Sequence, residues 1–245
     1  MNCKSHRLGT TAFCLIELAV TVAIVGILAA LILPALGRSR RKASEARCAS
    51  NLRQIHLGFI LYPADNRDRC PARFVWSGKL WNASDFLGGK DGSDGNYPPA
   101  RVRPLHPYLA AEEAFRCPAD VGIVRTNQGG VLMQPSCFDV MGLSYVYHSG
   151  MLLKGEEQST SGIGGNSMDW APNPAGYVLL YEHPALGAGQ KLAYWHRARK
   201  PGTGSSLQDG ERGPRYSAFV FLDGHTEFID RSGIYTDTLP GGDGP

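Results

Sequence analysis

The residues best placed for chemistry are His196, Asp223 and His225. Imidazole nitrogens and carboxylate oxygens are common metal ligands, and the same groups serve as general acids and bases. However, Asp223 is followed by Gly224 between two apolar runs, and an Asp-Gly pair at a hairpin tip is explained by turn geometry. His225 directly follows the turn and is expected to be exposed. The sequence therefore favours a structural turn over a metal or catalytic site here.

Cysteine is the other residue type that could bind a metal or form covalent links. The chain has 6 cysteines and no C-x-x-C pair, the spacing typical of zinc ribbons and thioredoxin-like proteins. In an oxidising compartment, the thiols beyond the apolar N-terminal segment could form two disulfides in three connectivities, and buried free thiols are the alternative. These cysteines are Cys48, Cys70, Cys117 and Cys137.

A glycine-rich stretch at residues 88–96 places Asp91, Asp94 and Asn96 close together. Oxygen-rich loops can bind calcium, but this one lacks the EF-hand spacing and a bidentate glutamate, so a solvated loop is the favoured interpretation. The chain also has no G-x-S-x-G, P-loop or G-x-G-x-x-G motif. We therefore predict no catalytic residue, no metal ligand and no enzymatic activity.

The charge balance argues against a nucleic-acid partner. The formal net charge is +3, and without Lys4 and Arg7 it falls to +1. This charge is too small to indicate the basic surface of a nucleic-acid-binding protein. A basic cluster at residues 38–42 directly follows the apolar segment and contains no aromatic residue. We therefore expect this cluster to contact lipid phosphates rather than nucleic acid.

Residues 13–36 form an apolar run whose single charged side chain is Glu17. As a helix, the run would extend about 36 Å, enough to cross a hydrocarbon core of about 30 Å. A secretory signal peptide is the alternative, with a small-x-small site at residues 35–37, but the apolar regions of such peptides are only about 7–15 residues long. The sequence therefore predicts a single transmembrane helix.

The residues before and around Glu17 resemble a known processing site. The stretch AFCLIEL (residues 12–18), followed by a long apolar run, resembles the cleavage and methylation site of type IV prepilins and type II secretion pseudopilins. The resemblance implies that residues 1–12 are a leader, that a prepilin peptidase cuts between Ala12 and Phe13, and that the new amino group of Phe13 is methylated. In two places the chain departs from the family pattern: Ala12 replaces the usual Gly, and Cys14 replaces Thr.

The same resemblance implies how the segment assembles. Glu17 would become the fifth residue of the mature chain and pair with the charged N-terminus of a neighbouring subunit, because a carboxylate in low dielectric needs a cation. Snorkelling of Glu17 to the lipid headgroups is the alternative. Pro34 stands where many members have a helix-kinking proline.

The resemblance also implies a location. It indicates a single-pass protein of the bacterial inner membrane, whose C-terminal domain lies in the periplasm or at the cell surface. The basic residues at 38–42 would by themselves favour a cytoplasmic domain, so the two signals conflict. The implied partners are prepilin peptidase, other pilin or pseudopilin subunits, and membrane lipid.

A stripe of apolar residues continues the helix beyond the membrane segment. Its members recur at spacings of 4, 3, 4 and 3 residues, the pattern of an amphipathic helix that Pro63 ends. The helix is therefore predicted over residues 13–62, with residues 37–63 as its amphipathic continuation and Asn51 on another face. Two helices with a break at residues 34–37 are the alternative. The stripe comprises Cys48, Leu52, Ile55, Phe59 and Tyr62.

Residues 64–245 are predicted to be a β-rich globular domain. Two apolar runs flank Asp223-Gly224, the strongest short signal of a hairpin with a type I′ turn. We expect an α+β fold: the long N-terminal helix packs on a small antiparallel sheet of three to five strands with long loops, a pilin-like roll. The other predicted strands lie at residues 144–149, 176–182 and 192–196, and the long loops at 64–143 and 197–215.

The resemblance extends into this domain. The stretches CASNLRQIHLGFILYPADNRDRCP, FRCPAD, SYVYH and FVFLDGH resemble a pseudopilin-like group with an H-x9-DG motif, although His196 precedes Asp223 by 27 positions. Major pseudopilins bind calcium in a C-terminal loop, but no ligand can be placed on these residues, so Ca²⁺ remains a cofactor without a location. If the domain is exported, we expect a disulfide between Cys48 and Cys117 and a companion between Cys70 and Cys137.

These features predict a structural protein. The chain is expected to be a subunit of a type II secretion pseudopilus or a type IV pilus-like filament, processed by prepilin peptidase and assembled through its N-terminal helix. The alternative is a membrane-anchored, exported binding module or enzyme that uses a prepilin-type anchor. Its active region would then lie in the loops at 64–143 and 197–215.

Overall fold

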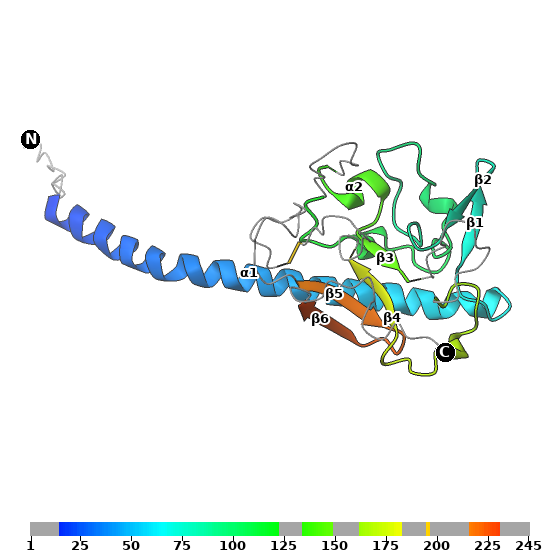
Figure 1. Cartoon of the computed structure of the whole chain (residues 1–245). Helices are drawn as coiled ribbons and strands as arrows, with labels where there is room; N and C mark the ends of the chain where they lie inside the picture. Colours follow the sequence, from blue (N-terminus) through cyan, green and yellow to red (C-terminus); the bar gives the residue numbers. More distant parts are fainter. Residues whose placement is uncertain (1–14, 123–133, 149–161, 183–194, 197–215, 231–245) are drawn as a thin grey trace, which may run out of the picture. The chain divides into compact units, whose positions relative to one another are not determined.

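The computed structural model describes residues 15–122, 134–148, 162–182, 195–196 and 216–230. The chain divides into two compact units, Met1–Ala43 and Ser44–Pro245. Helix α1 (Leu15–Asp65) contributes residues to both units, and short strands complete the second (Figure 1). The fold class is therefore α+β, as the sequence predicted.

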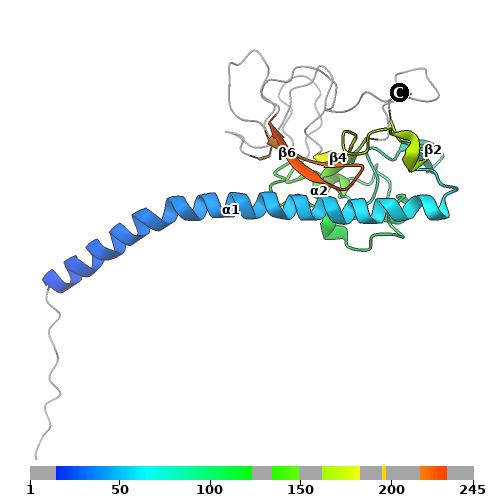
Figure 2. The ribbon, with the colours of Figure 1, turned by 90° about the horizontal axis from the view of Figure 1, so that it is seen from below.

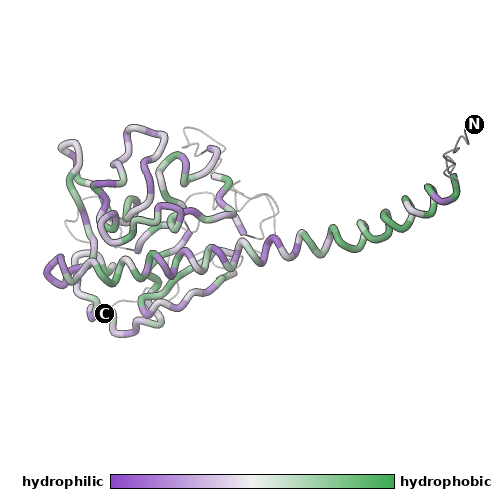
Figure 3. The backbone as a smooth tube through the Cα atoms, turned by 180° about the vertical axis from the view of Figure 1, so that it is seen from behind, coloured by the Kyte–Doolittle hydropathy of each residue, from purple (hydrophilic) through white to green (hydrophobic). Residues whose placement is uncertain are grey.

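In its described part, the first unit is the N-terminal portion of α1. This portion is long and apolar enough to cross a membrane, and its leucine, isoleucine and valine side chains are exposed. Figure 3 shows the apolar colouring along it, interrupted near its start. The helix continues without a break through Pro34 and Gly37, so the structure has one helix here rather than two.

The second unit contains two antiparallel sheets. In the larger sheet the strands follow the order β3-β4-β5-β6, each pairing with the next along the chain. The smaller sheet pairs β1 with β2. The strands are β1 (Arg73–Trp76), β2 (Lys79–Asn82), β3 (Tyr145–Tyr147), β4 (Val178–Glu182), β5 (Tyr216–Phe221) and β6 (Thr226–Asp230).

The predicted strands at residues 144–149 and 176–182 are confirmed as β3 and β4. Of the predicted strand at 192–196, the structure describes only its last two residues, and His196 forms an isolated antiparallel bridge with Tyr216. In the described residues of the unit there are also one short helix and three 3-10 turns. They are α2 (Cys137–Met141), η1 (Ala100–Val102), η2 (Glu112–Phe115) and η3 (Met168–Trp170).

The apolar stripe of α1 lies in the core of the second unit, as predicted. Four of its members are fully buried, and Tyr62 is partly buried against the same cluster. Figure 2 shows this portion of α1 alongside the strands. The sequence prediction was wrong for Asn51, which is buried because its amide Nδ2 donates to the carbonyl oxygen of Arg116 at 2.6 Å. The fully buried members are Cys48, Leu52, Ile55 and Phe59.

The hairpin β5–β6 is confirmed, but its turn differs from the prediction. The amide of Gly224 donates to the carbonyl of Phe221, and Gly224 has φ of +90° while Asp223 is not left-handed. A type I′ turn needs positive φ at both central residues, so this loop is instead a three-residue connection closed by a left-handed glycine. A Cβ on Gly224 would lie 2.9 Å from the ring of His56, whose Nε2 donates to Leu222. The glycine is thus required by backbone conformation and by close packing.

The segment between α1 and β3 is organised around one buried cation. Arg103 is 1% exposed, and its guanidinium donates to the carbonyl oxygens of Pro98, Gly88 and Met141 at 2.7–2.9 Å. Gly142, which ends α2 at φ +89°, leaves no room for a Cβ, because that atom would lie 1.9 Å from the carbonyl oxygen of Lys90. The sequence of this region has little periodicity, and its segments are held together by close packing of their backbones.

A second polar anchor in the same region is Asp120. Its carboxylate accepts hydrogen bonds from the backbone amides of Gly122, Cys137 and Phe138 and from the hydroxyl of Ser144. Burial raises the pKa of Asp120, and these hydrogen bonds act against that increase. One side chain therefore joins the segment after η2 to the start of α2 and to β3.

Replacing Asp120 with alanine is expected to lower the free energy of unfolding by about 3 kcal/mol, because the amides that it satisfies lose their acceptor. Thermal unfolding of the full chain in detergent measures the change. Glu112→Ala is the control, since Glu112 is exposed at the start of η2. Equal stability of the two variants would contradict the anchoring role of Asp120.

Candidate functional site

The residues predicted for processing and assembly belong to the first unit. Ala12 and Phe13 lie outside the described residues. Glu17 lies in the first turn of α1 and is exposed, and Pro34 lies within the same helix. The structure thus places the predicted assembly carboxylate at the start of an apolar helix.

Asp223 and His225 form an exposed pair at the β5–β6 turn. The carboxylate Oδ1 of Asp223 lies 2.6 Å from His225 Nδ1, and the imidazole stacks on Phe221 at 4.1 Å between ring centroids. Burial acts to raise the pKa of Asp223, but the hydrogen bonds from the backbone and ring of His225 outweigh it and lower the pKa. These contacts are those of a turn, as the sequence favoured.

The acidic stretch at residues 88–96 uses its oxygen atoms in local hydrogen bonds. Asp91 Oδ1 accepts from the amide of Ala100 at 2.6 Å. Asp94 Oδ1 accepts from both the backbone amide and the side-chain amide of Asn96. These oxygen atoms therefore stabilise the local backbone.

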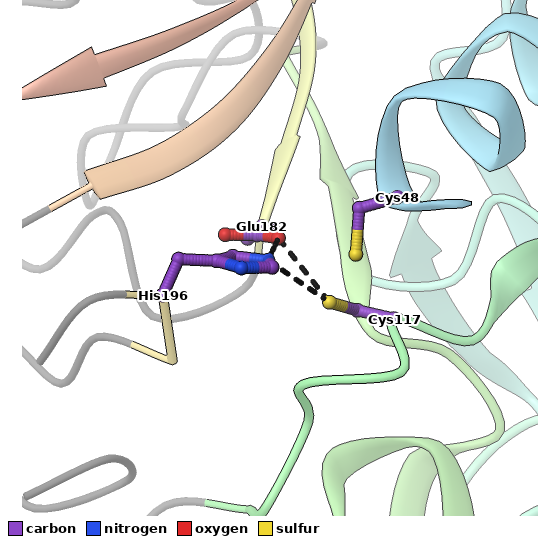
Figure 4. Close-up of side chains that lie close together, drawn as sticks. All are labelled: Cys48, Cys117, Glu182 and His196. Atoms are coloured by element: carbon purple, nitrogen blue, oxygen red, sulfur yellow. Dashed lines mark hydrogen bonds and ion pairs between the residues drawn. The ribbon is translucent and has the colours of Figure 1, made fainter. Parts of the chain in front are cut away.

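A different set of residues comes together in the interior of the second unit. Cys48, Cys117, Glu182 and His196 each offer one ligand-type atom, and all four atoms lie within 4.8 Å of one another. His196 Nε2 lies 2.7 Å from Glu182 Oε1, and Cys117 Sγ lies 3.3 Å from that oxygen and 3.4 Å from that nitrogen. Figure 4 shows the four side chains pointing toward one another. We name this set the buried cluster.

The two cysteines of the buried cluster are placed by α1 and by the segment after η2. Cys48 is the first member of the apolar stripe, so the packing of α1 directs its thiol inward. Cys117 follows Phe115, which is buried, and Arg116, whose carbonyl oxygen accepts from Asn51. The buried amide on α1 therefore fixes the backbone directly before the Cys117 thiol.

The other two members are placed by the larger sheet. Glu182 is the last residue of β4, and its second oxygen, Oε2, accepts from the backbone amide of Ala218 at 3.2 Å. His196 pairs with Tyr216 at the start of β5, and its ring packs edge-on against Phe228. Both ligand-type atoms are thus oriented by contacts outside the cluster.

In the buried cluster, the pKa values of the two thiols shift in opposite directions. Burial acts to raise the pKa of Cys48, but hydrogen bonds with Cys117 and His196 outweigh it and lower the pKa. Burial raises the pKa of Cys117 well above its ordinary value. Burial acts to lower the pKa of His196, yet its hydrogen bonds to Cys48 and Glu182 raise it to about 10. The cluster therefore lowers the pKa of one buried thiol and raises that of the other.

Tyr145 borders the buried cluster. It lies directly opposite Glu182 in the β3–β4 register and is 1% exposed. Within the described part of the chain, no hydrogen bond of full geometry reaches its hydroxyl oxygen. Burial and the nearby Cys117, Cys48 and Glu182 raise its pKa well above the ordinary value. A buried hydroxyl with a proton to donate thus lies beside the thiols.

None of the four described cysteines forms a disulfide in the structure. Cys48 and Cys117, the first predicted disulfide pair, lie side by side in the buried cluster. In the second predicted pair, Cys70 and Cys137, the Sγ atom of Cys70 lies 3.6 Å from the Sδ atom of Met168. Burial and the charge of Asp120 raise the pKa of Cys137. The two disulfides stay predictions for the oxidised protein.

The sequence singled out His196 and the two cysteines, but it did not bring them into one site. Glu182 was missed, although a carboxylate at the end of the apolar run GYVLLYE is an unusual choice for a buried strand. That signal could have identified it. The convergence of the four residues depends on long-range packing and has no local signature.

Comparisons with protein-family models, with curated proteins and with solved structures found no match. The resemblance to pilins and pseudopilins therefore rests on the sequence motifs. What the structure adds is an α+β chain and, in its described residues, one helix long and apolar enough to cross a membrane.

Proposed function

We propose that this protein is a structural subunit of a type II secretion pseudopilus or type IV pilus-like filament, anchored in the bacterial inner membrane before assembly. The position of Glu17 carries the proposal: it is the acidic residue in the first turn of a 51-residue helix whose N-terminal portion is apolar and exposed. A carboxylate in such surroundings is stabilised when a cation lies beside it. The ammonium of a neighbouring mature chain would be that cation.

Processing supplies the ammonium in this proposal. Prepilin peptidase removes residues 1–12 and methylates Phe13, which leaves a charged amine close to the depth of Glu17. The apolar portions of α1 from successive subunits then pack together, where leucine, isoleucine and valine side chains provide the contact. The C-terminal domain, proposed to be a pilin-like roll exported to the periplasm or cell surface, decorates the filament.

Replacing Glu17 with leucine is expected to reduce filament assembly at least about tenfold, since each 1.4 kcal/mol of lost pairing energy is a factor of ten. Membrane insertion should be unchanged, because the variant helix is more apolar. Sheared-filament yield and membrane fractionation, measured in cells that carry the assembly machinery, report the two quantities. Thr21→Val is the matched control, since it alters a neighbouring turn without touching a charge.

Mass spectrometry of the native N-terminus tests the processing step separately. A mature chain that begins with methylated Phe13 is the expected result. A native chain that still begins with Met1, or a Glu17→Leu variant that assembles as well as the wild type, would contradict the proposal. Substrate turnover by the purified chain would favour the alternative of an anchored enzyme.

A further inference from the structure

We propose that Cys48, Cys117, Glu182 and His196 form a structural zinc(II) site. The first argument is the type of donor. Two thiols, an imidazole and a carboxylate are the side chains that bind Zn²⁺ in proteins, whereas Ca²⁺ and Mg²⁺ take oxygen ligands. The site lies in the interior of the second unit and does not depend on the proposed filament role. It takes the place of the predicted Cys48–Cys117 disulfide, because both sulfur atoms bind the metal.

The second argument is the spacing of the donor atoms. A tetrahedral zinc ion with bonds of about 2.3 Å to sulfur and about 2.0–2.1 Å to nitrogen or oxygen separates its ligands by about 3.3–3.8 Å. Cys117 Sγ already lies 3.4 Å from His196 Nε2 and 3.3 Å from Glu182 Oε1. The nitrogen and oxygen are 2.7 Å apart as a hydrogen-bonded pair. A zinc ion would replace that hydrogen bond and widen the gap by about 0.6 Å.

The third argument is burial combined with charge. The exposed fractions of the four residues are 0% for Cys48, 1% for Cys117, 1% for Glu182 and 4% for His196. Buried ionisable groups are costly unless they are paired or coordinate a metal. Here two thiols and a carboxylate face one imidazole in the interior, and a divalent cation among them would give all four buried groups a partner.

The proton balance of binding is simple. Zinc binds cysteine as the thiolate and histidine as the neutral imidazole, so protons carried by the thiols and the imidazole leave to solvent when the ion binds. Only sulfur–hydrogen and nitrogen–hydrogen bonds are exchanged for bonds to zinc, and no redox step is involved.

The fourth argument is the surrounding shell, because groups that orient metal ligands are part of a built site. The amide of Ala218 holds Glu182 Oε2 and leaves Oε1 facing the thiols. The buried hydroxyl of Tyr145, which lacks a partner of full geometry in the described structure, lies beside the sulfur atoms and can donate to a metal-bound thiolate. Hydrogen-bonding partners of this kind orient the ligands of a metal site, and they have no such role in a purely apolar core.

The role of the ion follows from the number of protein ligands. Four side chains fill a tetrahedral shell, and all are shielded from solvent, so no position remains for substrate or water. The site is therefore structural rather than catalytic. It would join α1, the segment after η2, the end of β4 and the bridge at His196, which come from four distant parts of the sequence.

Metal analysis of the full-length chain, purified in detergent without added metal, tests the proposal. The expected result is close to one zinc ion per chain, with loss of at least nine-tenths of that zinc in Cys117→Ala and in Glu182→Gln. Cys70→Ala is the matched control and should retain the metal, because Cys70 is a buried thiol outside the buried cluster.

Measurements on the wild-type chain keep the test decisive if a variant does not fold. Removal of the metal with a chelator should lower the unfolding temperature, and reloading with Co²⁺ should give a thiolate-to-cobalt charge-transfer band with the intense visible bands of a tetrahedral ion. Zinc content near zero would overturn the proposal. So would a Cys48–Cys117 disulfide found by peptide mapping, an octahedral cobalt spectrum, or equal zinc loss from Cys70→Ala.

Discussion

Replacing Arg103 with methionine is expected to lower the free energy of unfolding by about 3–5 kcal/mol. The guanidinium is 1% exposed and donates to three backbone carbonyl oxygens, of Pro98, Gly88 and Met141. Methionine fills a similar volume but has no donor, so these acceptors lose their shared partner inside the protein. Burial lowers the pKa of Arg103 to about 10.

Denaturant unfolding of the detergent-solubilised full chain measures this loss, with circular dichroism as the probe. Arg101→Met is the matched control, because Arg101 lies in η1, which Arg103 directly follows, and is exposed. The control should change stability by no more than about 0.5 kcal/mol. If both variants lose the same stability, the carbonyl contacts of Arg103 do not organise the segment between α1 and β3.

Replacing Phe59 with alanine is the other large expected effect, with a loss of about 3–5 kcal/mol. Phe59 is 0% exposed on the buried stripe of α1, and its ring lies 5.1 Å from that of Tyr147 in β3. Removing the ring leaves a cavity between helix and sheet that neighbouring side chains fill only in part. The cost therefore includes both lost burial and the cavity that remains.

Leu57 provides the control for Phe59. It lies two residues earlier on α1 and is 58% exposed, so Leu57→Ala should change stability by no more than about 0.5 kcal/mol. The same unfolding measurement on the full chain compares the two variants. A Phe59→Ala variant as stable as Leu57→Ala would mean that this stripe does not hold the helix on the sheet.

Local patterns in the sequence determined much of the fold. The spacing of apolar residues after Ser44 gave the buried face of α1, because a helix repeats every 3.6 residues whatever it packs against. The alternation in β5 was equally informative: Val220 packs in the main core and Phe219 and Phe221 in a second cluster. The Asp-Gly pair located the hairpin because these two residues favour the backbone conformations of a chain reversal.

Tertiary structure decided what those patterns could not. The turn is not type I′, because the register of β5 with β6 pairs Val220 with Thr226 and leaves a longer connection than a two-residue turn. Asn51 is buried because its side-chain amide donates a hydrogen bond to the carbonyl oxygen of Arg116, 65 positions later in the chain. Arg103 looks like a surface residue in the sequence, and only the three carbonyl oxygens around it explain its burial.

The buried cluster shows the same division most clearly. The sequence by itself gave the residue types, two cysteines and a histidine, and the apolar run that ends in Glu182. It gave no sign that Cys48, Cys117 and His196 meet, because the spacing along the chain carries no constraint once residues belong to different elements. Their meeting is set by the packing of α1 on the sheet, since only the folded core brings four distant donors within 4.8 Å of one another.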